Sequence, residues 1–116
     1  MKKLLYIIPL LALMISAAVP SQLLKTGLRV TIIDELGNIQ QDAKVVLYPS
    51  LEEYRKDSNA VASTTTDKRG VAKFTDLKPQ IYYVNASKGD KNNIGAGVQT
   101  DTLKEGRINK VNIVIE

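Results

Sequence analysis

The chain has 116 residues, of which 44% are hydrophobic and 24% charged, a composition that suits one globular domain and not two. It contains no cysteine and no histidine, which excludes disulfides, zinc fingers, thiol catalysis and histidine acid–base chemistry. The net charge of +4 falls by two, to +2, without Lys2 and Lys3, which is too weak to predict nucleic-acid binding.

The N-terminal segment has the layout of a secretory signal peptide. A basic start precedes an almost unbroken apolar run over residues 4–19, and the small residues Ser16 and Ala18 stand where signal peptidase reads. That run is shorter than the roughly 20 residues that a bilayer span needs, although an uncleaved anchor is the alternative. We expect a signal peptide at 1–18, a lead-in at 19–26 and one exported domain at 27–116, with no stable membrane anchor after cleavage.

The first two predicted strands alternate apolar and polar residues, as half-buried strands do. Residues 28–33 would turn one apolar set inward, residues 43–48 would turn a second set inward, and Tyr48 would lie outward. Between them, residues 35–38 form a turn. Residues 51–57 predict one or two helical turns that pack on the sandwich through Leu51 and Tyr54. The inward positions are Leu28, Val30, Ile32, Ala43, Val45 and Leu47.

The middle of the chain reads as strand, turn, strand, turn, strand over residues 63–86. A D-K-R-G sequence at 67–70 predicts the first turn, because aspartate bonds nearby backbone and glycine accepts positive φ. Strand parity places Tyr82 inward and Tyr83 outward. A polar loop then follows at 87–93, a glycine-weakened strand at 94–100, and a last strand at 108–116, with Val111, Ile113 and Ile115 inward.

Two segments carry a family resemblance. "TTTDKRGVAKFTDLKPQIYYVNAS" resembles the core signature of carboxypeptidase-regulatory-like domains, and "VTIIDELGNIQQDAKVVLYPS" resembles their opening hairpin. These domains belong to the prealbumin-like (transthyretin-like) β-sandwich group. The resemblance implies an all-β, about seven-stranded antiparallel sandwich with Greek-key topology. An immunoglobulin fold is the alternative, but its cysteine pair and core tryptophan are absent.

The resemblance does not bring a catalytic site with it. Hydroxyisourate hydrolases also resemble transthyretin, but their catalytic histidines and C-terminal tail have no match in this sequence. We therefore expect no catalytic residues and no enzymatic activity. Related pilin domains form a Lys–Asn cross-link between the first and last strands. Here Arg29 stands on the first strand, so Asn109 and Asn112 are interpreted as outward polar residues.

Candidate binding residues cluster late in the chain. Asp90, Asn92 and Asn93 offer the oxygen ligands that calcium prefers, and Asp76 or Asp101 could join them, although turn formation explains the same residues. Exposed tyrosines could stack on a sugar or anchor a protein. We expect no cofactor, with calcium as an alternative.

The predicted function is an exported module, in the periplasm or on the cell surface, that binds an envelope protein or gives structural support. The alternative is binding of calcium or of a carbohydrate such as a surface glycan. The predicted binding surface is Tyr54, Tyr83, Lys88, Asp90, Asn92 and Asn93.

Overall fold

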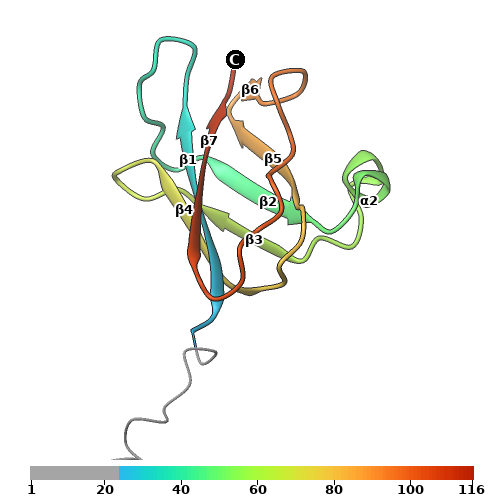
Figure 1. Ribbon diagram of the computed structural model, residues 1–116. Coiled ribbons are helices and arrows are strands. Elements are labelled where there is room, and N and C mark those ends of the chain that lie inside the picture. Colours follow the sequence, from blue (N-terminus) through green and yellow to red (C-terminus); the bar gives the residue numbers. More distant parts are fainter. Residues whose placement is uncertain (1–23) are drawn as a thin grey trace, which may run out of the picture.

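The computed structural model describes residues 24–116 as a β-sandwich with one short helix (Figure 1). The predicted signal peptide and most of the lead-in lie outside the described residues. Within residues 24–116 no helix has the length and apolar character needed to cross a membrane. The elements are β1 (Thr26–Ile33), β2 (Lys44–Tyr48), α2 (Leu51–Lys56), β3 (Ala62–Thr65), β4 (Val71–Leu77), β5 (Tyr83–Lys88), β6 (Lys91–Asn92) and β7 (Ile108–Val114).

The strands form two sheets, and this confirms the predicted all-β sandwich. One sheet has the order β4-β1-β7 and the other the order β3-β2-β5-β6. The pairings are antiparallel except that of β1 with β7, which is parallel and aligns Val30 with Val111. Parallel neighbours require a long connection. Here most of the domain supplies it, because β1 begins the described chain and β7 ends it.

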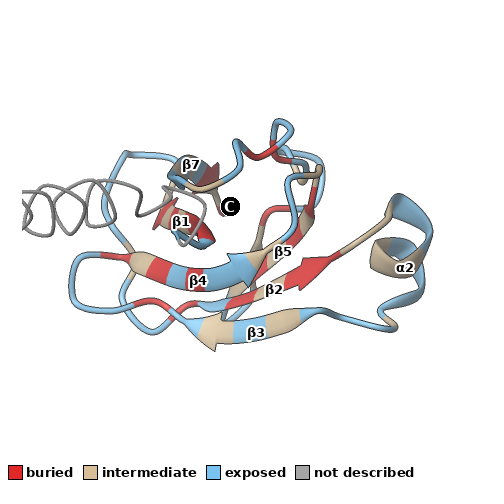
Figure 2. Cartoon of the chain, turned by 60° about the horizontal axis from the view of Figure 1, so that its bottom comes forward, coloured by how far each residue is buried: buried red, intermediate tan, exposed pale blue. Residues whose placement is uncertain are grey.

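The core lies between the sheets and is mainly aliphatic. Inward positions on β1, β2 and β5 are almost completely buried, as the red segments of Figure 2 show. Each fully buried aliphatic side chain contributes about 1.5–3 kcal/mol, so these strands provide most of the apolar stabilisation. The predicted inward residues of the first two strands and Tyr82 are all confirmed, and so are Ile113 and Ile115 on the last segment, with Val111 partly buried against them.

The helix α2 corrects the predicted environment of Tyr48. This tyrosine does occupy an outward strand position, but it is only 1% exposed. The Tyr54 ring meets it edge-on at 5.8 Å between centroids, and the Tyr48 hydroxyl donates to the Asp57 carboxylate at the helix C-cap. Burial, with the Asp57 carboxylate second, raises the pKa of Tyr48 to about 12. The predicted packing through Tyr54 is thus present, whereas Leu51 is 36% exposed.

The segment before β7 differs most from expectation. Residues 94–96 form a turn and residues 97–100 an irregular segment instead of a strand, with Gly95 and Gly97 at positive φ. This segment meets β5 through an isolated bridge from Gln99 to Tyr83. The seventh strand is instead β6, inside the predicted polar loop. In addition, β4 extends to Leu77, into the second turn predicted at residues 76–79.

Candidate functional site

The predicted calcium loop is a hairpin between β5 and β6. Lys88 pairs with Lys91 across it, and Asp90 lies exposed in its turn. The Asn92 side chain accepts a hydrogen bond from the Ile94 amide at 2.9 Å, and its backbone pairs with Glu116. Asp90 and Asn92 therefore lie near the surface, but Asn92 already forms hydrogen bonds within the chain.

Asn93 is not at the surface, which corrects the exposed position predicted for it. Its side chain is completely buried. The side-chain oxygen accepts from the Ala86 amide at 3.0 Å, and the nitrogen donates to the Val84 carbonyl at 2.8 Å and the Gly97 carbonyl at 3.1 Å. The Asn93 amide thus replaces a neighbouring strand beside β5, because it satisfies backbone groups that a ladder would otherwise pair.

The two predicted tyrosines of the binding surface lie over the same sheet but are not free. Tyr83 is half-buried and pairs across the strands with Tyr48. Tyr54 projects from α2 onto that same Tyr48 ring, and burial raises its pKa. The tyrosines therefore mainly attach α2 to the sheet, as cross-strand aromatic pairs commonly do.

Asn109 also differs from its prediction as an outward residue. Its amide nitrogen donates to the Gly27 carbonyl at 3.0 Å and the Lys104 carbonyl at 3.1 Å, and its oxygen accepts from the Lys104 amide at 2.9 Å. It therefore organises the turn that leads into β7. Asn112, by contrast, is exposed as predicted.

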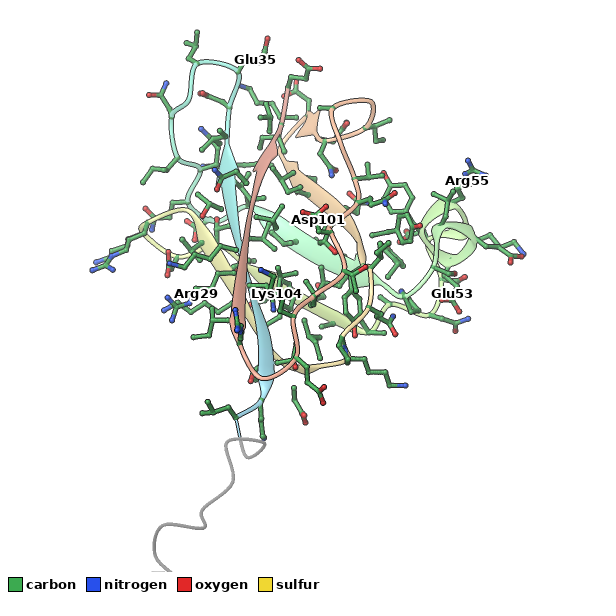
Figure 3. The ribbon with its side chains drawn as sticks, in the orientation of Figure 1. Arg29, Glu35, Glu53, Arg55, Asp101 and Lys104 are labelled. Atoms are coloured by element: carbon green, nitrogen blue, oxygen red, sulfur yellow. The ribbon has the colours of Figure 1, made fainter. Side chains whose placement is uncertain are left out.

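The outer face of the β4-β1-β7 sheet carries a row of cationic side chains that no single sequence motif predicts. Arg29 on β1 pairs directly with Lys73 on β4 and with Lys110 on β7. Directly paired residues share a face, so three cations form a row across the sheet, spaced by the strand separation of about 4.8 Å. We call these three residues the cation row. Arg29 extends outward from the sandwich (Figure 3).

Among residues 24–116, no carboxylate forms a salt bridge with the cation row. The outward positions of these three strands are otherwise occupied by glycine, threonine, asparagine and aliphatic residues. In addition, β4 carries one exposed carboxylate, Asp76, where its register with β1 shifts. The one salt bridge among the described residues joins Lys56 to Glu52 on α2, at 2.9 Å between the Lys56 nitrogen and a Glu52 oxygen. Like charges directly opposite one another on a sheet repel, so the row gives this face a positive potential.

A hollow of about 670 Å³ lies beside the cation row. It combines an apolar part, to which Leu24 and Ile108 contribute, with four cationic residues and no acidic one. Leu24 is 66% and Ile108 is 55% exposed. We call this the basal hollow; its cationic residues are Lys25, Arg29, Lys73 and Arg107.

This arrangement can attract and hold an anion. The part of the chain that the structure describes contains no group of three or more His, Cys, Asp or Glu side chains placed to hold a metal. Each of its buried side-chain polar atoms has a hydrogen-bond partner. The sequence shows each cation at an outward strand position, but only the sheet order brings them into one row.

Comparison with known proteins supports the fold. No protein-family model matches the chain, and no curated protein matches its sequence. Among solved structures, it is similar to the Bacillus anthracis TIE protein, with a TM-score of 0.55, 19% identity and coverage of 79% of this chain and 17% of that one. The Bacillus cereus major pilin subunit BcpA gives a TM-score of 0.50 and 17% identity, covering 78% and 29% of the two chains.

A third similar structure is the group B streptococcus pilus 2b backbone protein, with a TM-score of 0.51 and 14% identity. It is covered over 40% of its length, and this chain over 78%. The chain therefore spans well under half of each of these structures. At such identities the likeness shows the fold alone, a β-sandwich.

Proposed function

We propose that this protein is an exported, non-enzymatic β-sandwich module that binds another component of the cell envelope. The observation that carries the proposal is the outer face of the β4-β1-β7 sheet, where the cation row and the basal hollow lie together and no described carboxylate forms a salt bridge with them. An unpaired charge row opposes sheet stability, and such departures from local rules occur mainly at functional sites.

Export and family membership form part of the same proposal. The signal-peptide pattern of residues 1–18 supports export, and the similar structures include two pilus proteins. The resemblance to carboxypeptidase-regulatory-like domains agrees with the two-sheet architecture. That group hosts many functions on one scaffold, so the binding role is argued here from the surface itself.

An affinity experiment on envelope extract tests the proposal. The bait is the chain from Val19 to Glu116, in three forms: wild type, a variant with the cation row neutralised, and a variant with residues 87–93 exchanged for an unrelated turn. We expect one dominant component to be retained by the wild type and by the loop-exchanged form, and lost from the charge-neutralised form. Equal retention by all three baits, or by none, would refute binding through this face.

A further inference from the structure

The face that carries the proposed function also indicates the chemistry of what it binds. We propose that the cation row and basal hollow bind an acidic polysaccharide, whose sugars carry carboxylate, sulfate or phosphate groups. This inference rests on the proposed function and names the ligand class of the same surface. The argument has three parts: the charge, the shape and the mixed character of the hollow.

The charge is concentrated well beyond what composition predicts. Residues 24–116, which exclude Lys2 and Lys3, have a net charge of only +2, yet five cations border this one face. A cluster of one sign attracts a polyanion, since several charges on one chain engage several cations together. The five are Lys25, Arg29, Lys73, Arg107 and Lys110.

The shape of the hollow depends on Gly27. The other six glycines of the chain have positive φ, whereas Gly27 does not, so backbone conformation does not demand glycine there. A Cβ atom at this position would lie 3.2 Å from the Phe74 carbonyl oxygen and 3.8 Å from Ile108 Cγ1. A side chain would therefore occupy the hollow, which lies where β1 and β4 lose regular register. Glycine within a strand commonly marks such a bulge or a close approach by a ligand.

The mixed character of the hollow selects among anionic ligands. Its apolar part can pack against the C–H face of a sugar ring, while the surrounding cations meet acidic groups at the ring edge. The volume of about 670 Å³ suits a small number of sugar rings. A flat anionic membrane would contact the row but leave the hollow unfilled. An acidic peptide would bring charge without the ring.

The test measures binding of defined polymers by isothermal titration or surface plasmon resonance. Polygalacturonate and dextran sulfate are the acidic glycans, and dextran is the neutral one. Polyglutamate supplies the same charge without sugar, and phosphatidylglycerol vesicles supply an anionic surface. We expect at least one acidic glycan to bind at least about tenfold more tightly than dextran, polyglutamate or the vesicles. Its affinity should fall at least about tenfold as added salt screens the charges.

Two triple variants give a matched comparison. Arg29→Gln with Lys73→Gln and Lys110→Gln neutralises the cation row. The control, Arg55→Gln with Lys44→Gln and Lys88→Gln, removes the same residue types from exposed positions on α2 and the other sheet. Arg55 lies across the molecule from Arg29 (Figure 3). Because the first variant relieves repulsion between paired strands, its melting temperature should not fall, so lost binding will not reflect unfolding.

The expected result is a loss of acidic-glycan affinity of at least about tenfold in the cation-row variant and less than about threefold in the control. Failure of both acidic glycans to bind the wild type would overturn the inference. So would equal binding of polyglutamate or of the vesicles, or equal loss in the two variants. The proposed function would survive such a result if the envelope extract still yielded a component lost only from the cation-row bait.

Discussion

The buried amide of Asn93 offers a sharp test of how the second sheet is completed. The variant Asn93→Ala removes an acceptor from the Ala86 amide and a donor from the Val84 carbonyl, both buried groups on β5. Each unsatisfied buried backbone group costs about 1–3 kcal/mol. The third partner, Gly97, lies in an exposed turn that water reaches. We therefore expect about 2–6 kcal/mol of lost unfolding free energy, the lower end applying if water enters.

Urea denaturation followed by circular dichroism measures this loss, with Asn92→Ala as the matched control. Asn92 accepts one exposed hydrogen bond from Ile94, so its removal should cost less than about 1 kcal/mol. At about 4–8 °C per kcal/mol for a domain of this size, the Asn93→Ala loss corresponds to a melting temperature lower by at least about 8 °C. If the two variants lost equal stability, the Asn93 side chain would not be replacing a strand, and the reasoning would be refuted.

Three further changes test other parts of the structure. Gly70→Ala should lose about 2–3 kcal/mol of unfolding free energy in thermal denaturation, since φ is +75° and a Cβ would lie 2.9 Å from a neighbouring side-chain carbon. Gly37→Ala has a similar φ but open space around the Cβ, so it should lose only about 1 kcal/mol, and equal losses would contradict this. Tyr48→Phe should lose about 1 kcal/mol with its bond to Asp57. The folded state raises the pKa of Tyr48 to about 12, so the wild type should lose unfolding free energy as pH rises from about 10 to about 12. Tyr48→Phe should lack this alkaline loss, and an unchanged alkaline profile would count against the reasoning. Hydrogen bonds from the Val71 and then the Arg69 backbone lower the pKa of Asp67. The stability that Asp67 contributes is therefore present above the unfolded pKa of about 4 and is lost as pH falls through the folded value. The melting temperatures of wild type and Asp67→Asn should differ at neutral pH and converge in acid, and a constant difference would refute this.

The sequence was sufficient for the parts of the fold that local pattern controls. Alternating residues on β1 and β2 identified their buried faces, because strand parity fixes which side each residue takes. The D-K-R-G turn was likewise local: the Asp67 side chain accepts from the Arg69 amide at 2.9 Å and the Val71 amide at 3.1 Å. Residues within such a motif carry its geometry themselves.

The errors arose where distant segments determine the environment. Tyr48 has outward parity, and only the later packing of α2 covers it. Asn93 is polar and lies in a polar stretch, which indicates exposure, but its amide completes the edge of β5. The apparent alternation at residues 94–100 did not become a strand, because two glycines there adopt positive φ.

The candidate surface could not be predicted for a related reason. Arg29, Lys73 and Lys110 are ordinary outward residues when each strand is considered alone. They become neighbours because β1 pairs with β4 on one side and with β7 in parallel on the other. Neither the sheet order nor the register follows from alternation, since parity gives the face of a residue but not its partner strand.

The most direct test of the outer face as the binding site is an NMR titration of the isotope-labelled domain with an oligogalacturonate. Backbone amide shifts locate the contact without any mutation. The account predicts that the perturbed amides lie on β1, β4 and β7 around the cation row and at Gly27. Perturbation centred instead on Tyr83 and the β5–β6 hairpin would contradict the account and return the site to the region that the sequence first indicated.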